Sequence, residues 1–517
     1  MNRLANRSKY MKNDFGEPPF SVAVPVEPCA RPTVHWKWSG SSLSEFELKN
    51  YCCMVPDSTR LSSKANAFSL FSDRYGGEGI GFCGGSARCA TNYDVQIKGI
   101  GLTPLFSIRP GSEPDVLHSD GTIDLLDAGH EAIMSSICGA ILPYGAVPTL
   151  ALASTGTLAR AAFAKPQAPP SVPRIILLRL FALRPAHFLR NIHFRPRPEL
   201  GITDDSTRVR GAMQMLPAIL EREFGVEKSH INEGLLAMAA RFAKQLAAAH
   251  AKRIFHGGLS ASNIALDGRF LDFGTCTAVP AYRRRVGAPK PGGPDIWDQS
   301  AYVERIFSSM LQHLQRYLPL PPNYKIVSAS DLLEDFRSCH QTRMAVEFSK
   351  LSGIPEEALL LMPKKLLDDV YRCMQEIALR GSRRYILKEW HDDTDITAPP
   401  LQSIGRHDLN DALRAYAEEN LGKSASLREN LGDFVLANAL SGCLDSIYAA
   451  YMEQQAVESR HRLRVAALQR CLRLNGPLDF LVRESIYKEL RKFEENPAGV
   501  GAFIDATIAS ALHILSC

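Results

Sequence analysis

The sequence predicts an α+β fold built in two unequal parts, and three observations support this. A glycine-rich turn and short β-branched runs occupy the first third of the chain. After about Gly201, apolar residues recur at helical spacing instead. The chain has 517 residues, of which 45% are hydrophobic and 22% charged, so it can bury a large core without disulfides. We therefore expect a smaller part that contains a sheet and an enlarged helical part after it.

The first part is predicted to span residues 61–200. Its predicted elements are a strand at 93–98, a helix at 123–137, and buried strands at 147–153 and 174–180. Residues 1–60 are rich in Pro, Ser and charged residues, and we expect an N-terminal extension with little regular structure.

The second part is predicted to span residues 201–517 and to be mainly helical. Residues 234–251 have an amphipathic pattern, and 263–274 read as a strand, an Asp-Gly turn and a second strand. Helical periodicity then continues from residue 300, with predicted loops at 317–325, 392–406 and 473–477. A sheet with one helix joined to a larger helical part is the two-lobed plan of a protein kinase.

Composition argues against several classes of protein. The net charge is only +5, and no basic block or aromatic-interleaved basic stripe is present, so we expect no nucleic-acid partner. The 12 cysteines include no CxxC pair, which favours reduced, buried thiols. The N-terminal residues lack the apolar segment of a secretory signal. The longest apolar stretch, 132–153, is interrupted by Pro143 and Pro148, so we expect a cytoplasmic protein without a membrane span.

Asn263 and Asp272 are the most informative residues. They lie nine positions apart, on either side of the predicted Asp-Gly turn, and Asp272 begins the tripeptide Asp-Phe-Gly. Amide and carboxylate oxygens hold magnesium against ATP, and kinases place an Asn and an Asp in this way. The alternative is an ordinary hairpin in which both side chains are solvated.

Lys98 ends the first predicted strand, about 20 residues after the start of the glycine-rich turn. A lysine there can reach ATP phosphates if a carboxylate on the next helix holds it, and Glu131 is the expected partner. Backbone N–H groups of the glycine-rich turn can approach phosphate closely. The nucleotide-binding glycines are expected to be Gly79, Gly81, Gly84 and Gly85. The alternatives are a solvated lysine and a plain glycine turn.

Four segments resemble the selenoprotein O group of pseudokinases in order and spacing: YDVQIKGIGLTPL, SDGTIDLLDAGHEAI, LPYGAVPTLALASTG and HGGLSASNIALDGRFLDFG. The resemblance covers roughly residues 70–300. It implies a protein-kinase fold that binds ATP in reversed orientation and transfers AMP to protein hydroxyl groups. It also implies that Lys98 binds phosphate, that Glu131 is its ion-pair partner, and that Asn263 and Asp272 bind Mg²⁺ or Mn²⁺.

The resemblance further implies a phosphate clamp of two arginines. Arg184 and Arg190 fit it, although their spacing is one residue shorter than in the family, and Arg179 competes for the first position. The alternative is that these are surface arginines following a strand.

The main departure from the family is Ser262, which stands where the catalytic base, an Asp, precedes the metal-binding Asn. A serine cannot accept a proton from a hydroxyl at neutral pH. The Ser262-Asn263 pair resembles the MchC subgroup, which implies modification of a microcin-type peptide with an acyltransferase-like partner protein. A peptide carboxylate is already ionised at pH 7 and needs no base. The chain is thus expected to transfer AMP to a protein or peptide; the alternative is a catalytically reduced scaffold that binds ATP and supports a partner enzyme.

Overall fold

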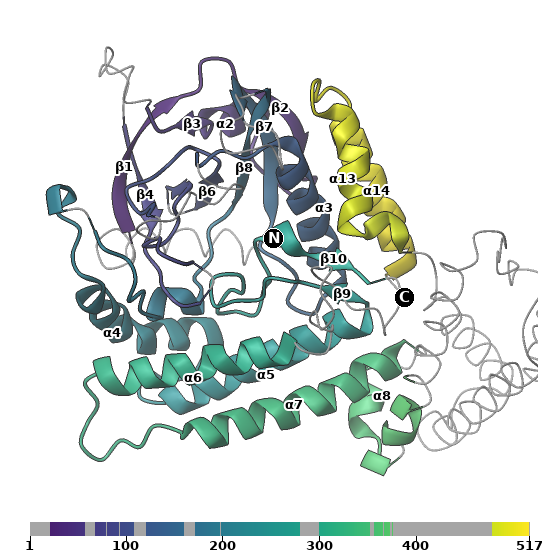
Figure 1. The fold of residues 1–517 in the computed structure, drawn as a ribbon. Helices are drawn as coiled ribbons and strands as arrows, with labels where there is room; N and C mark the ends of the chain where they lie inside the picture. Colours follow the sequence, from purple (N-terminus) through teal and green to yellow (C-terminus); the bar gives the residue numbers. More distant parts are fainter. Residues whose placement is uncertain are drawn as a thin grey trace, which may run out of the picture.

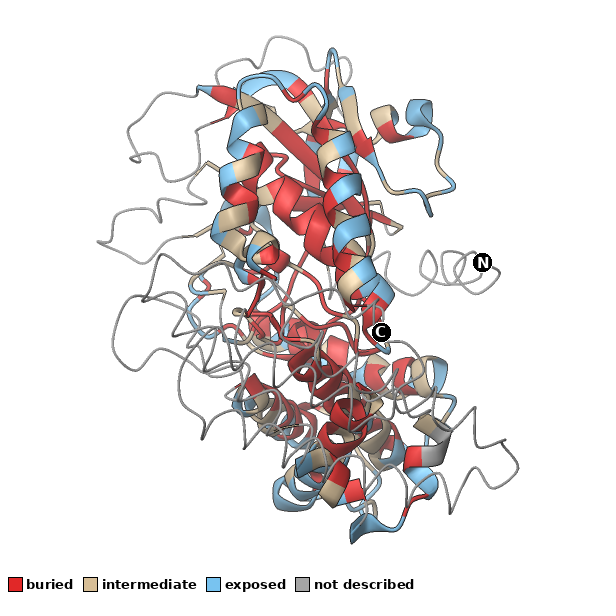
Figure 2. Cartoon of the chain, turned by 90° about the vertical axis from the view of Figure 1, so that its right-hand side faces the viewer, coloured by how far each residue is buried: buried red, intermediate tan, exposed pale blue. Residues whose placement is uncertain are grey.

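The structure is a computed structural model that describes residues 21–56, 68–107, 120–159, 171–279, 299–351, 356–375 and 478–515, apart from positions 79, 93, 197, 366, 373 and 374. Its architecture is α+β, as the sequence predicts. An antiparallel sheet with one long helix, α3, lies above a layer of helices, α4 to α8, and two C-terminal helices, α13 and α14, stand beside α3 (Figure 1). Buried residues run through the sheet and through the helices below it (Figure 2).

Eight strands of the described residues form one sheet, in the order β2-β7-β8-β6-β5-β4-β1-β3. All neighbours pair antiparallel. The strands are β1 (Ser21–Pro28), β2 (Thr33–Lys37), β3 (Cys53–Met54), β4 (Phe68–Asp73), β5 (Cys89–Thr91), β6 (Val95–Lys98), β7 (Thr149–Ala159) and β8 (Val172–Leu180). The short strands β9 (Ile254–Phe255) and β10 (Thr277–Ala278) pair separately.

The sheet begins earlier in the chain than the sequence predicts. Residues 21–28 and 33–37 are strands, although 1–60 was expected to have little regular structure. Burial alternates along β1: Val24 and Val26 are buried, whereas Ala23 and Pro25 are exposed. The prolines made this strand pattern hard to recognise in the sequence. The short helix α2 (Glu45–Asn50) follows, capped by Ser44 and Glu47. Residues 21–56 therefore belong to the sheet-containing part.

Helix α3 (Leu125–Ile141) is the predicted helix at 123–137, shifted by a few residues. Asp124 caps it by accepting a hydrogen bond from the backbone N–H of Asp127, at 3.1 Å. The helix is buried on nearly every side because it packs against β7 and β8 on one face and α13 and α14 on another. This double packing fixes the side chains that α3 presents to the site.

The described residues of the helical part form four long helices and one shorter one. They are α4 (Asp205–Phe224), α5 (Ile231–Ala251), α6 (Gln299–Tyr317), α7 (Ala329–Lys350) and the shorter α8 (Glu356–Leu361). Helix α5 is central, since it packs against α4, α6 and α7. Helix α4 ends at Gly225, whose φ of 71° is the left-handed conformation that commonly stops helices. None of the helices in the described ranges is long and apolar enough to cross a membrane.

The C-terminal helices α13 (Arg483–Leu490) and α14 (Val500–Leu515) pack against α3 and β2, although the sequence assigned them to the helical part. The indole N–H of Trp36 donates a hydrogen bond to Asp505, at 2.9 Å. The Leu490 side chain fits so closely over Gly129 that a Cβ there would lie 2.8 Å from it. This segment is thus an outer layer on the sheet-containing part. The loops predicted at 392–406 and 473–477 lie outside the described residues.

Candidate functional site

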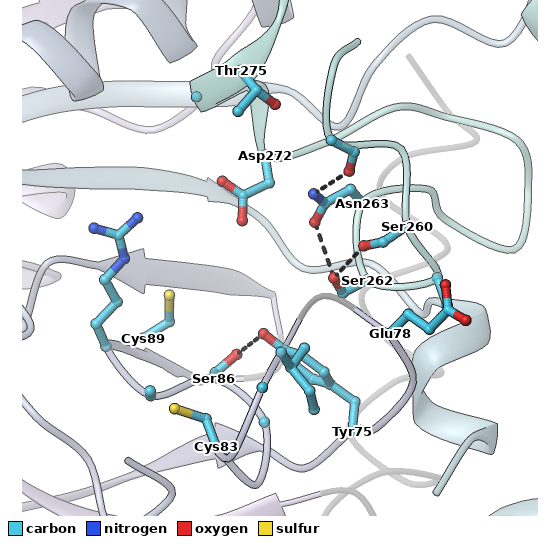
Figure 3. A pocket seen from close by; sticks show the side chains of 18 of the residues that line it. Tyr75, Glu78, Cys83, Ser86, Cys89, Ser260, Ser262, Asn263, Asp272 and Thr275 are labelled. Carbon is cyan, nitrogen blue, oxygen red and sulfur yellow. Dashed lines mark hydrogen bonds between the residues drawn. The ribbon is translucent and has the colours of Figure 1, made fainter. Parts of the chain in front are cut away.

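A cavity of about 840 Å³ is lined by residues from both parts of the molecule. The glycine-rich turn, β6 and α3 line it from the sheet-containing part. Residues 258–263, the 3₁₀ turn η5 (Phe273–Thr275) and α6 line it from the helical part. Figure 3 shows Asp272, Asn263 and Ser262 from this second group, and Tyr75 and Ser86 from the first, around the same space. Most of the predicted site residues lie here.

Lys98 is held by two carboxylates. Its Nζ lies 2.6 Å from Glu131 Oε2, so the ion pair predicted between strand and helix is present. It also lies 2.6 Å from Asp272 Oδ1, a contact that the sequence did not predict. β6 has both β5 and β8 as neighbours, and all four of its residues are buried. The lysine therefore projects from a fixed position in the sheet and joins α3 to the loop that carries Asp272.

Arg179 completes this cluster from β8. Its Nη1 lies 2.7 Å from the second Glu131 oxygen, and its Nε donates to the Gln96 side-chain oxygen at 2.8 Å. The strand pleat explains its direction. Ile175 and Leu177 belong to the core that contains α3, and Arg179 is the next residue on that face. Arg179 lines the cavity. It is therefore the better placed of the two candidates, Arg179 and Arg184, for the first arginine of the expected phosphate clamp.

The charges of this cluster stabilise one another. Burial would raise the pKa of the Asp272 carboxyl, but the charge of Lys98, and those of Arg179 and Arg88, hold that pKa well below its usual range. Burial would lower the pKa of Lys98, but Asp272 and Glu131 outweigh it and raise the pKa above its ordinary value. At neutral pH the lysine and Asp272 are therefore both ionised.

Asp272 has an unusual backbone. Its φ is 61°, in the left-handed region that residues other than glycine rarely adopt. The predicted Asp-Gly turn precedes it: Ile264 bridges Phe270 antiparallel, and the Leu271 N–H donates to the Asn263 carbonyl at 3.1 Å. Such strained residues concentrate at functional sites, because the surrounding structure must hold them in place.

Asn263 and Ser262 form a neutral hydrogen-bonded group beside Asp272. The Asn263 amide donates to the Gly258 carbonyl at 2.7 Å, and its Oδ1 accepts from the Ser262 hydroxyl at 3.1 Å. The Ser260 and Ser262 hydroxyls lie 2.9 Å apart. In Figure 3 the Asn263 and Asp272 side chains stand on the same side of the cavity. Both residues line the cavity.

This oxygen pair fits a hard divalent cation. Magnesium typically binds one or two protein oxygens and takes its other ligands from water and phosphate. Within the described ranges, no three or more His, Cys, Asp or Glu residues cluster so as to hold a metal ion themselves. Asn263 and Asp272 are thus the two oxygen-bearing side chains that could hold such a cation, with its other ligands coming from outside the protein.

The two arginines expected to form a phosphate clamp lie elsewhere, and neither lines the cavity. Arg184 is buried, donates to the Ser262 carbonyl at 3.2 Å and the Gln96 side chain at 3.1 Å, and lies over the Tyr75 ring. Arg184 therefore holds the backbone of the loop that carries Ser262. Arg190 contacts Asp205 at 3.4 Å and the Tyr317 hydroxyl at 3.1 Å. The sequence spacing could not show that neither side chain lines the cavity.

Of the four glycines predicted to bind the nucleotide, two line the cavity. These are Gly81 and Gly85. The φ of Gly85 is 147°, and no side chain would fit there because a Cβ would lie 2.0 Å from the Asp73 carbonyl oxygen. Gly84 instead faces Phe194, whose ring carbon would lie 2.6 Å from an added Cβ. Gly79 lies outside the described residues.

Sequence reasoning missed several cavity residues, among them Arg88, Glu78 and Arg483. Arg88 follows the glycine-rich turn directly, and its place ten residues before Lys98 was an available signal. Glu78 lies in that turn and pairs with Arg305 of α6, at 3.1 Å. Arg483 comes from α13, and no local pattern could have linked it to this site.

No protein-family model matches the sequence, and a search of curated proteins finds no significant match. The resemblance to the selenoprotein O group therefore rests on the motifs alone.

Proposed function

We propose that this protein has a two-lobed, kinase-like fold and transfers AMP from ATP to a protein or peptide, with Mg²⁺ or Mn²⁺ as cofactor. The observation that carries the proposal is the position of Lys98, which contacts both Glu131 and Asp272 inside a cavity that Asn263 also lines. A strand lysine, a helix glutamate and a loop Asn and Asp around one cavity are the parts that position ATP in kinases.

Each group has a distinct role in this proposal. Lys98 and Arg179 would bind phosphate oxygens, because both are ionised and held in place by Glu131. Asn263 and Asp272 would bind the divalent cation, which supplies positive charge against the phosphates. The glycine-rich turn would approach the nucleotide with its backbone N–H groups.

The acceptor in this proposal is a carboxylate, such as the C-terminus of a peptide in microcin-type modification. One carboxylate oxygen attacks the α-phosphorus of ATP, the bond from that phosphorus to the α–β bridging oxygen breaks, and pyrophosphate leaves with the electron pair. The product is an acyl adenylate, which a second nucleophile, supplied through an acyltransferase-like partner, could open. No proton is removed, so the reaction needs no base at Ser262.

Glu78 bears on the choice of acceptor. It lines the cavity, and its side chain is 72% exposed. Figure 3 shows it in the same view as Ser260 and Ser262. A hydroxyl acceptor would require a base, and Glu78 is the carboxylate of the cavity least enclosed by the protein. A hydroxyl acceptor would therefore depend on Glu78 as a base, whereas a carboxylate acceptor would not.

Pyrophosphate release tests the proposal. The full chain, with any required partner protein, is incubated with ATP, Mg²⁺ and peptides that end in a free carboxylate or an amide. Turnover restricted to the free carboxylate is expected. Asp272→Asn should abolish it, whereas Asp267→Asn, at the hairpin turn and paired with Arg269, serves as the matched control. Equal turnover of the free-carboxylate and amidated peptides would contradict a carboxylate acceptor and favour a hydroxyl acceptor.

A catalytically reduced scaffold is the second candidate, and one observation favours it. The Asn263 oxygen accepts a hydrogen bond from Ser262, and the Asp272 carboxylate is paired with Lys98, so both metal-binding side chains already have protein partners. A scaffold would bind ATP, shift its melting temperature and release no pyrophosphate with any peptide. Thermal shift and turnover measured together thus separate the two candidates.

A further inference from the structure

The C-terminal segment supplies a cation to the cavity. Arg483 is the first residue of α13 and lines the cavity, although about 200 residues of sequence separate it from the Asp272 loop. Its backbone N–H donates to the Thr277 hydroxyl at 3.1 Å, which fixes the start of the helix beside β10. The packing of α13 against α3 fixes the rest of the helix. The arginine therefore has a defined position at the cavity wall.

The guanidinium of Arg483 is oriented by an aromatic ring. It lies over the Tyr487 ring, 4.7 Å from the centroid, and its Nη2 donates to the Tyr487 hydroxyl at 3.2 Å. That hydroxyl donates in turn to the Asp127 carboxylate at 2.7 Å, and Asp127 also lines the cavity. Burial, and then the charge of Asp127, raise the pKa of Tyr487, so it remains a donor. Arg483 is thus held without an ion pair of its own.

The absence of an ion pair distinguishes Arg483 from two other cavity cations. Lys98 and Arg179 both contact Glu131. Arg483 has no carboxylate within 4.0 Å among the residues that the structure describes, and its Nε is buried without a hydrogen-bond partner there. A buried donor left unpaired is costly, and an arginine binds planar or tetrahedral oxyanions through two donors at once. The geometry favours an anionic ligand.

We infer that Arg483 binds an anionic oxygen group, a phosphate or a carboxylate, of a molecule held in the cavity. This inference rests on the proposed function, which supplies two sources of such a group. They are the polyphosphate of ATP and the carboxylate of the acceptor. The C-terminal segment is then part of the binding site and not only a cover for α3.

Calorimetric titration of the full chain tests this inference with three probes: inorganic triphosphate, ATP with Mg²⁺, and a peptide with a free or amidated C-terminus. Arg483→Gln should weaken binding of one anionic probe about 10- to 100-fold, as expected for a lost charge-assisted hydrogen bond. Weakened triphosphate and ATP binding assigns Arg483 to the nucleotide. Weakened binding of the free-carboxylate peptide alone assigns it to the acceptor.

Three control variants separate ligand binding from damage to the fold. Lys488→Gln removes an exposed charge from the same helix and should leave every affinity unchanged. Arg483→Lys keeps the charge and should restore part of the affinity, which a purely structural role would not predict. Tyr487→Phe keeps the ring but removes the hydroxyl, and should weaken binding less than Arg483→Gln does.

Two outcomes would overturn the inference: equal affinities of wild type and Arg483→Gln for every probe, or a wild type that binds none of them. A third outcome separates it from the proposed function. If the wild type binds triphosphate through Arg483 but neither binds ATP nor releases pyrophosphate, the anion site stands and AMP transfer fails.

Discussion

Two neighbouring groups of polar side chains in the cavity differ in how they are held. The charged cluster consists of Lys98, Glu131, Arg179 and Asp272. Its ion pairs are 2.6–2.7 Å long and join four segments that are distant in sequence: β6, α3, β8 and the loop that carries Asp272. The neutral cluster consists of Ser260, Ser262 and Asn263. Its hydrogen bonds are 2.9–3.1 Å long and lie within one loop.

This difference has a physical consequence. Removing one member of a buried ion-paired cluster leaves an uncompensated charge, which is far more costly than losing a neutral hydrogen bond. The charged cluster is therefore fixed by the fold, whereas the neutral cluster can change its residue types at little cost in stability. We expect substitutions in the first to affect folding and binding together, and those in the second to affect the choice of acceptor.

Lys98→Met should have the largest effect on stability. It leaves Glu131 with Arg179 alone and Asp272 without its closest cation, and breaking a buried pair in this way typically costs about 3–5 kcal/mol. Urea denaturation measures the loss. Lys49→Met, which breaks an exposed pair on α2, is the control and should change little. Equal stabilities of the two variants would show that the charged cluster contributes nothing to the fold.

Ser262→Asp should redirect the reaction instead of unfolding the protein. It adds a negative charge beside Asn263, which repels an acceptor carboxylate and supplies a base for a hydroxyl. A positioned base typically contributes about 10²–10⁴-fold. We expect turnover of free-carboxylate peptides to fall and that of serine-containing, amidated peptides to rise. Ser262→Asn, neutral and of similar size, is the control. An unchanged preference would contradict the role given to this position.

Asp73→Asn should change the pH dependence of stability. Asp73 is buried beneath the charged cluster and accepts a hydrogen bond from Gln96 at 2.5 Å. Burial raises its pKa from 3.8 to about 6, although the charges of Arg184 and Arg179 oppose the shift. The folded protein thus holds this proton more tightly than the unfolded chain, so stability falls as pH rises from about 4 to 6.

The asparagine variant lacks this titration. Relative to Asp73→Asn, the wild type should lose about 2–3 kcal/mol of unfolding free energy between pH 4 and pH 7, by the rule of about 1.4 kcal/mol per pKa unit. Urea denaturation of both proteins at several pH values measures the difference. Parallel pH profiles would show that Asp73 keeps its ordinary pKa.

Glu78→Gln should have the smallest effect on stability. Its pair with Arg305 is exposed at both ends, and such pairs contribute under about 1 kcal/mol. Turnover is the informative measurement. With a carboxylate acceptor the variant should keep its activity, since no base is needed. A fall of 10²-fold or more would identify Glu78 as a base and favour a hydroxyl acceptor.

The sequence predicted the parts of the site whose signals are local. Lys98 ends a strand, Glu131 lies on the following helix, and the Asp-Gly turn separates Asn263 from Asp272 by a fixed length of chain. These short-range patterns are enough to predict the α+β class and the strand–helix ion pair. They also predict that Asn263 and Asp272 flank one turn.

The parts that it missed depend on long-range packing. Three arginines near the end of β8 were candidates, and the pleat of the strand, which places Arg179 on the face of Leu177 toward α3, was the unused signal. Pro25 obscured the alternation of the first strand. Arg483 could not be found at all, because its place at the cavity follows from how α13 packs and not from any spacing.

The packing of α13 and α14 on α3 also bears on how the chain folds during synthesis. About 340 residues separate the end of α3 from the start of α13. At translation rates of about 5–20 residues per second, roughly 20–70 seconds pass between the emergence of the two. During that interval Gly129 and its neighbours on α3 lack the apolar cover that, among the described residues, Leu490 and α14 later provide. The sheet-containing part therefore completes its apolar packing only after the C-terminal helices have been synthesised.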